Sequence, residues 1–384
     1  MIIEASTVLT PDVEYKPGWI EVKGKDIICV GSGEPPRPAE YSLEATVVPG
    51  FIDAHVHGGG GYSFTDQDAH AADHVAAIHL LHGTTSMMAS LVTRPHEELV
   101  ASVRRLSGKV LQGVIVGIHL EGPWLSVDHR GAHDPQFLKN PRIGDVMEIL
   151  EAGAGAIRMV TLAPELEGSH EAIREIRDHG AVAAIGHTGA SYDQTRAAID
   201  AGARVGTHVF NGMRPIHHRE PGPVGALLEN SAVFCEVIAD GVHLHPVAIR
   251  AVFNSPCKTV LVTDAMAAAC ASEGRYYLGG VAVDVQDGQA RAVDSGSIAG
   301  STLTLDAALR YAVKRAGIPL PLAVRSLTEN PAAMLNLSHV GRIEAGKRAD
   351  LVVLDPNLMV RAVMREGQWI TSPAARQKMS AGRT

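Results

Sequence analysis

Residues 180–213 contain a strand, a helix and a second strand in close succession, and this unit constrains the fold more than any other stretch. The run 182–185 is short and wholly apolar, which is typical of a strand buried on both faces. Ser191, followed three residues later by a glutamine, matches the capping box that begins a helix, and Gly202 fits its end. Residues 204–207 enter the next strand. The unit therefore predicts two neighbouring parallel strands joined by a helix.

Further apolar runs recur along the chain at the same interval, with helix-length segments between most of them. Together with the first unit they make eight predicted strands, and the additional runs are residue 51, 84–88, 114–118, 157–162, 233–238 and 259–262. This pattern predicts an α/β fold with a (β/α)8 TIM-like barrel over residues 49–340, a span close to the usual size of about 250 residues with insertions. Residues 273–296 depart from it and predict an inserted β-hairpin, after which helices resume at 302–316 and 321–335.

Both ends of the chain read as short strands between glycines and prolines. They are expected at residues 2–5, 18–22, 26–30, 350–354, 360–364 and 368–370. Neither end is long enough for a core of its own. We expect residues 1–48 and 341–384 to combine into one small sheet domain, with a loosely ordered tail from residue 372.

The overall charge and composition exclude several classes of protein. The net charge is −8 without a lysine or arginine tract, which argues against a nucleic-acid partner. We expect no membrane span, because no run of about 18 apolar residues occurs. The first ten residues lack the features of a signal peptide, and the four cysteines show no CxxC spacing, so we expect free thiols in the cytoplasm.

Polar residues follow the predicted strands at the point where each strand ends. His187 and His208 occupy equivalent places after two successive strands. Either histidine alone is easily explained as a buried ring that bonds a backbone carbonyl. The pair favours two ligands of one metal ion, because the carboxyl ends of barrel strands meet on the face that carries the chemistry.

Reading the other strand ends in the same way extends the set of candidate ligands. The full set is His55, His57, Glu121, His187, His208 and Asp264. Imidazoles and carboxylates suit zinc or another divalent first-row metal. Glu121, His187 and His208 would leave a position open for water, as in catalytic sites, while His55 and His57 could hold a second ion with Glu121 bridging. Asp264 is either a ligand or the general base beside the water.

Two longer motifs resemble a known family. Pro49-Gly-Phe-Ile-Asp53-x-His55-x-His57 and the segment 341–354 resemble the two signatures of the amidohydrolase superfamily. Six further motifs, covering nearly the whole chain in order, resemble its N-acetylglucosamine-6-phosphate deacetylase family: 119–124, 186–188, 207–213, 219–222, 240–243 and 262–265. The resemblance implies a metal-dependent hydrolase barrel carrying a small β-sandwich made by the two chain ends.

Carried over position by position, the resemblance implies a role for each motif residue. Glu121, His187 and His208 would bind the main ion, and His55 and His57 a second one; Asp264 and His133 would be catalytic; Ala132, His133, Asn211, Gly212, Arg219, Asp240, His243, Ile298, Ala299 and Gly300 would contact the substrate. Zinc is favoured, with Fe²⁺, Mn²⁺ and Co²⁺ as alternatives. Some relatives lack histidines of the first strand and use one ion, so the pattern leaves the number of ions open. Arg219 reaches in from a neighbouring subunit in this family, which implies a homodimer.

The implied reaction removes the acetyl group of N-acetylglucosamine 6-phosphate, as a step in amino-sugar catabolism and cell-wall sugar recycling. Metal-held hydroxide would attack the acetyl carbonyl, with Asp264 acting as base and then as acid and His133 helping to polarise the carbonyl. One alternative is a cyclic-amide hydrolase of the dihydropyrimidinase type. Those enzymes use a carboxylated lysine on the fourth strand, and residues 157–165 contain no lysine. A second alternative is a barrel that has lost turnover, although no implied ligand is missing.

Overall fold

A computed structural model of the chain describes residues 1–10 and 12–373. Within these residues, eight parallel strands form one sheet in the order β15-β14-β13-β12-β11-β10-β9-β6. The strands are β6 (Phe51–Asp53), β9 (Thr84–Val92), β10 (Gly117–Glu121), β11 (Ile157–Leu162), β12 (Val182–Ile185), β13 (Val205–Gly206), β14 (Phe234–Ile238) and β15 (Lys258–Val262). A parallel bridge between Val56 and Ala265 links the first strand to the last one, so the sheet closes. The predicted (β/α)8 barrel is confirmed.

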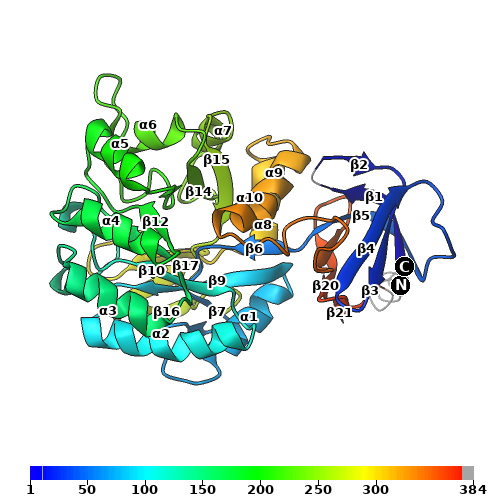
Figure 1. The fold of residues 1–384 in the computed structure, drawn as a ribbon, viewed down its shortest axis with the longest axis horizontal. Coiled ribbons are helices and arrows are strands. Elements are labelled where there is room, and N and C mark those ends of the chain that lie inside the picture. Colours follow the sequence, from blue (N-terminus) through cyan, green and yellow to red (C-terminus); the bar gives the residue numbers. More distant parts are fainter. Residues whose placement is uncertain (11, 374–384) are drawn as a thin grey trace. The chain divides into compact units, whose positions relative to one another are not determined.

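Helices alternate with these strands, and α2 to α5 lie on the outside of the sheet (Figure 1). The helices are α1 (Ala71–Leu80), α2 (His96–Leu111), α3 (Ile143–Gly153), α4 (Ser169–Asp178), α5 (Tyr192–Ala201), α6 (Gly222–Leu228), α7 (Pro246–Phe253), α8 (Leu305–Lys314), α9 (Leu320–Leu327) and α10 (Glu329–Met334), with 3₁₀ turns at Val127–His129 and Pro135–Phe137. The predicted capping box opens α5: the Ser191 side chain accepts from the Gln194 backbone, and the Gln194 side chain accepts from the Ser191 backbone. One helix expected at 321–335 is split at Thr328 into α9 and α10.

The inserted segment near 273–296 is larger than the predicted hairpin. Three antiparallel strands, β16 (Gly274–Leu278), β17 (Val281–Gln286) and β18 (Gln289–Ala292), form its sheet. The third strand escaped prediction because its polar residues leave little apolar alternation. The apolar face of this sheet packs on Val92, Met266 and Ala299, which brings the segment to the end of β9 and to the loop after β15. A further two-stranded sheet joins β7 (Gly58–Gly59) and β8 (Tyr62–Ser63).

A separate sheet combines strands from both ends of the chain, drawn in blue and red in Figure 1. Its order is β21-β20-β19-β5-β1-β3-β4, with β2 beside β1. The strands are β1 (Ile2–Leu9), β2 (Glu14–Tyr15), β3 (Gly18–Lys23), β4 (Asp26–Ser32), β5 (Tyr41–Pro49), β19 (Leu351–Leu354), β20 (Val360–Arg365) and β21 (Gln368–Thr371). β5 was not predicted, because it follows the loop-forming prolines of residues 35–38 and its alternating first half reads as a continuation of that loop. Ile3, Ile20, Val47, Leu351 and Met364 belong to its core.

By internal contacts the chain divides into two compact units. One contains Met1–Asp53, His79–Ser86 and the residues from Leu305 onward, and the other contains Ala54–Ile78 and Met87–Thr304. The predicted domain boundaries at residues 48 and 341 remain a prediction, and the predicted loose tail lies mostly outside the described residues. Within the described part of the chain, no helix is both long and apolar enough to cross a membrane.

Candidate metal centre and active site

The barrel strands place the predicted ligands by one simple rule. His55, His187, His208 and Asp264 each stand two residues beyond the last residue of a strand, and Glu121 is the last residue of β10. Because parallel strands of a barrel end at the same rim, side chains at these positions converge. All five belong to the second of the two compact units.

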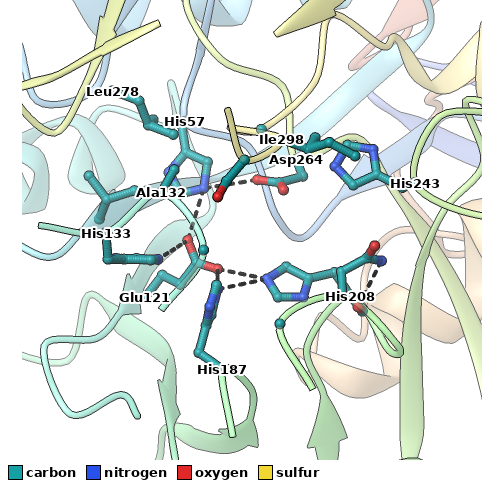
Figure 2. A pocket seen from close by; sticks show the side chains of 16 residues that line it. His57, Glu121, Ala132, His133, His187, His208, His243, Asp264, Leu278 and Ile298 are labelled. Carbon is teal, nitrogen blue, oxygen red and sulfur yellow. Dashed lines mark hydrogen bonds and ion pairs between the residues drawn. The ribbon is translucent and has the colours of Figure 1, made fainter. Parts of the chain in front are cut away.

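Three of these residues bring their ligand atoms to one point. The Glu121 Oε1 atom lies 3.1 Å from His187 Nε2 and 2.9 Å from His208 Nε2, and the two ring nitrogens are 3.1 Å apart. Figure 2 shows the two rings pointing at the same carboxylate. Atoms that each bind one tetrahedral zinc ion at roughly 2.0–2.1 Å lie about 3.3 Å apart, so this spacing fits a shared ion.

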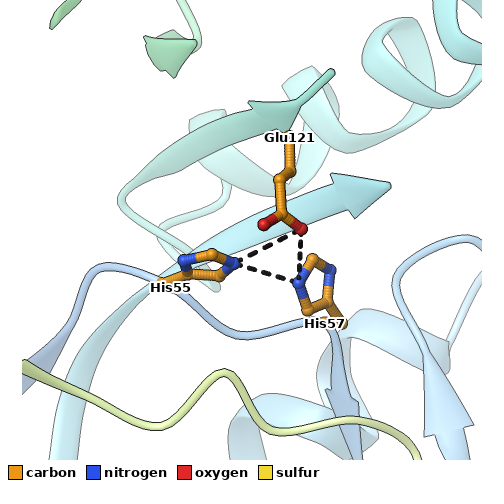
Figure 3. Close-up of side chains that lie close together, drawn as sticks. All are labelled: His55, His57 and Glu121. Atoms are coloured by element: carbon orange, nitrogen blue, oxygen red, sulfur yellow. Dashed lines mark hydrogen bonds and ion pairs between the residues drawn. The ribbon is translucent and has the colours of Figure 1, made fainter. Parts of the chain in front are cut away.

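The other carboxylate oxygen of Glu121 faces the first-strand histidines (Figure 3). Glu121 Oε2 lies 3.2 Å from His57 Nε2 and 3.6 Å from His55 Nε2, and the two Nε2 atoms are 3.0 Å apart. Asp264 Oδ1 approaches the same nitrogens at 3.1 Å and 3.4 Å. His55, His57 and Glu121 could therefore hold a metal ion, and so could Glu121, His133 and His187.

The outward-facing nitrogens of the rings fit a metal centre. His57 Nδ1 lies 3.1 Å from the Ser90 carbonyl and His187 Nδ1 lies 2.9 Å from the His129 carbonyl. A carbonyl can only accept, so each Nδ1 carries the proton, and in a neutral ring the Nε2 lone pair then faces the cluster. This arrangement is the one that metal-binding histidines adopt.

The charges in the cluster also favour a cation. Burial opposes protonation of His55 and His57, yet the carboxylates of Glu121 and Asp264 outweigh it: the pKa of His55 lies well above its usual range, and that of His57 rises to about 9. Burial also opposes ionisation of Glu121 and Asp264, but the neighbouring histidines lower the pKa of both carboxyls. The carboxylates thus favour positive charge beside them, which a metal ion would supply.

Three site residues have a left-handed backbone that side chains other than glycine rarely adopt. The φ angles are +48° at His187, +29° at His208 and +49° at Asp264. Such conformations cost on the order of 1–3 kcal/mol each and concentrate at functional sites. The turn at each strand end directs the side chain toward the cluster, so the strain coincides with the converging residues.

A cavity of about 240 Å³ opens onto this cluster. Its lining includes the predicted Ala132, His133, Asn211, Gly212, His243, Ile298 and Gly300, together with Val92, Gly131, Leu278 and Ser297. Figure 2 shows His133 and His243 on different sides of the Glu121 carboxylate. Leu278, Ser297 and Ile298 come from the inserted sheet and the loop after it, so the insertion forms one wall of the cavity.

Three predicted substrate residues lie outside the cavity lining. Ala299 is fully buried in the core beneath the inserted sheet. Asp240 instead holds His243, with its Oδ2 atom 2.7 Å from His243 Nδ1; burial opposes ionisation of Asp240, but these hydrogen bonds lower its pKa. Arg219 is exposed, and its guanidinium lies 2.7 Å from His218 Nε2.

Two contacts of the site were missed by sequence reasoning. Thr93, one residue after β9, donates its backbone N–H to His133 Nδ1 at 3.4 Å, and its hydroxyl lies 2.9 Å from the same atom. Glu236, inside β14, lies 3.0 Å from His55 Nδ1. The contact of Glu236 could have been suspected from the sequence, because a carboxylate within the apolar run 233–238 would be buried and a buried charge requires a partner.

Comparison with known proteins identifies the family. The family model described as "Amidohydrolase family" matches residues 46–370. The chain belongs to the amidohydrolase family. This family is metal-dependent, in agreement with the cluster of histidines and carboxylates.

Within this family, the most similar proteins include sugar-phosphate deacetylases. An N-acetylgalactosamine-6-phosphate deacetylase of Escherichia coli O157:H7 is 38% identical over 83% of this chain and 86% of its own. An N-acetylglucosamine-6-phosphate deacetylase of Danio rerio is 37% identical over 84% of each. A crystal structure of N-acetyl-D-glucosamine-6-phosphate deacetylase from Mycobacterium smegmatis is 48% identical with a TM-score of 0.93, covering 97% of this chain and all of that one. The resemblance noted in the sequence is confirmed.

Proposed function

We propose that the chain hydrolyses the acetamide of N-acetylglucosamine 6-phosphate to glucosamine 6-phosphate and acetate. The observation that carries this proposal is the convergence of Glu121, His187, His208 and Asp264 on one cavity wall, in a chain similar to deacetylases of such sugars. The reaction belongs to amino-sugar catabolism and the recycling of cell-wall sugars.

The donor set supports one divalent ion at Glu121, His187 and His208 and a second at His55 and His57. Nitrogen and oxygen donors favour Zn²⁺, with Fe²⁺, Mn²⁺ and Co²⁺ as alternatives. When bound, such an ion polarises a carbonyl oxygen and lowers the pKa of water. The Glu121 carboxylate would serve both positions, because its two oxygens face different pairs of histidines.

Asp264 and His133 would move and hold the protons of the reaction. The pKa of Asp264 is lowered, so its carboxylate is ionised near neutrality and can take a proton from water and then give it to the leaving amine. Burial lowers the pKa of His133 to about 4, which leaves the ring neutral. Because His133 Nδ1 accepts from the Thr93 backbone, Nε2 carries the proton of the neutral ring; it lies 3.5 Å from Glu121 Oε2 and would donate from there toward a developing oxyanion.

Recognition of the rest of the substrate falls to the cavity wall and to a second subunit. Asn211, Gly212 and Ile298 would contact the sugar, and His243, oriented by Asp240, would hold the phosphate together with Arg219. Arg219 lies on the surface of its own chain, which supports its contribution to the phosphate site across a homodimer interface. A cytoplasmic location remains a prediction of the sequence.

Acetate release by the purified, metal-loaded chain tests the proposal. N-acetylglucosamine 6-phosphate should give the highest kcat/KM, above the N-acetylgalactosamine epimer and above the unphosphorylated sugar. The epimer is included because one relative is named for it. Preference for the epimer would transfer the proposal to that sugar, and no acetate from either phosphorylated sugar would refute it.

A further inference from the structure

Glu236 is a fully buried carboxylate in the middle of β14, where its neighbours Cys235 and Val237 are also fully buried. Its ion pair is with His55. In the described part of the chain, none of the ion pairs made by Glu236, Glu121 or Asp264 involves a lysine or an arginine. A buried carboxylate needs partners, and those of Glu236 belong to the metal centre itself.

The hydrogen bonds of Glu236 point to that role. Its Oε2 atom lies 3.0 Å from His55 Nδ1, and a carboxylate accepts there, so Nδ1 carries the proton. In a neutral ring this leaves the lone pair of Nε2 facing His57 Nε2, 3.0 Å away. Glu236 therefore fixes His55 in the tautomer and ring orientation that a metal ligand needs.

Glu236 also contacts the strand end that carries the other ligand set. Its Oε2 atom accepts from the backbone N–H of His208 at 3.3 Å, and its carbonyl accepts from the backbone N–H of Val209 at 2.9 Å. The remaining oxygen, Oε1, has no hydrogen-bond partner among residues 1–10 and 12–373. The residue is thus anchored by three contacts to two ligand-bearing segments.

The contrast with the other histidines shows what a carboxylate adds. His57 and His187 are oriented by backbone carbonyls, which are neutral. A negative charge behind His55 makes its Nε2 a stronger donor and adds a third carboxylate to Glu121 and Asp264. Three carboxylates exceed the charge of one divalent ion, whereas two divalent ions exceed the three carboxylates by one positive charge, which one further anion would neutralise.

We propose that Glu236 is a positioning residue that prepares His55 to hold the second ion. This inference rests on the two-ion site of the proposed function. It predicts that replacing Glu236 weakens the His55–His57 position much more than the Glu121–His187–His208 position, where Glu236 Oε2 meets the backbone N–H of His208 and not the ring.

Metal binding, measured apart from turnover, tests the proposal. Glu236→Met removes the acceptor at similar length, and Glu236→Gln removes the charge but keeps an acceptor. Metal-free protein would be titrated with Zn²⁺ against a chromophoric chelator, and the bound metal counted by mass spectrometry. We expect the second ion to bind about 100-fold more weakly in the Met variant and about tenfold more weakly in the Gln variant, within the usual range of such partners.

Cys235→Ala serves as the matched control, since Cys235 is equally buried on the same strand and its side chain points to the opposite side. It should lower the Tm without changing metal affinity. Wild-type affinity in both Glu236 variants, or in the Gln variant alone if the Met variant does not fold, overturns the role of Glu236. So does equal weakening of both ions. A wild-type chain that takes up one equivalent overturns the two-ion site itself.

Discussion

Asp264→Asn separates proton transfer from metal binding more cleanly than any other change in the site. The residue has a φ of +49°, and asparagine tolerates this left-handed conformation whereas alanine is strained there by roughly 1–2 kcal/mol. The backbone of Asp264 donates to the His55 carbonyl at 2.8 Å and accepts from the Ser301 N–H at 2.7 Å. The amide therefore replaces the carboxylate without moving the chain.

The expected loss follows from the two proton transfers assigned to one group. General acid–base catalysis contributes roughly 10²–10⁴-fold for a single positioned group. Since the same carboxyl acts first as base and then as acid, we expect kcat to fall on the order of 10³–10⁵-fold, or about 4–7 kcal/mol.

Steady-state acetate release, with metal content measured on the same samples, checks this prediction. The variant should keep the Glu121–His187–His208 ion and show a KM close to that of the wild type. If it retained more than about a tenth of the wild-type kcat with full metal content, Asp264 would not be the acid–base group. If the metal were lost as well, Asp264 would be a ligand, the other role that the sequence left open.

Three further outcomes are expected. Arg219→Ala should raise KM about tenfold or more for the phosphorylated sugar and hardly for the unphosphorylated one, and equal effects on both in a kinetic assay would exclude a phosphate contact. Replacing His55 and His57 together by alanine should lower the metal content by one ion per chain, with elemental analysis as the measurement; unchanged stoichiometry would show that they are not ligands. Ser191→Ala should reduce the free energy of unfolding by about 1 kcal/mol in urea, whereas Ser191→Asp should preserve it, because the cap of α5 is lost only in the first.

The barrel could be predicted because several of its strands combine two independent signals, an apolar run and a polar ligand residue at its end. The run 182–185 is apolar throughout and is followed by His187, so both burial and the strand end are visible in the sequence. The ends of the strands were predicted less accurately than their existence: the third barrel strand was expected at 114–118 and is found at Gly117–Glu121. Residues 114 and 115 are apolar but precede the hydrogen bonds to β9, the first of which runs from Val116 N–H to the Met87 carbonyl, and apolar character alone does not say where hydrogen bonding begins.

Much of the site could be anticipated from residue type and position, and its supporting contacts could not. Glu121 and His208 stand at strand ends, which the sequence reveals. Thr93 contacts His133 through its backbone N–H, and Glu236 contacts His55 through a buried carboxylate oxygen. Which histidine each of them contacts depends on the register between strands that are distant in sequence. Asp240 illustrates the same limit: its substrate contact remains a prediction, and its hydrogen bond to His243 could not be read from the sequence.

The left-handed backbone at His187, His208 and Asp264 means that the fold is less stable at the places where it does its chemistry. Glycine at any of the three would relax the chain while deleting a functional group, so selection for thermal robustness alone would erode catalysis. Substitutions intended to raise the thermal stability of this barrel should therefore be placed in the helices and outer loops and not at the carboxyl ends of the strands.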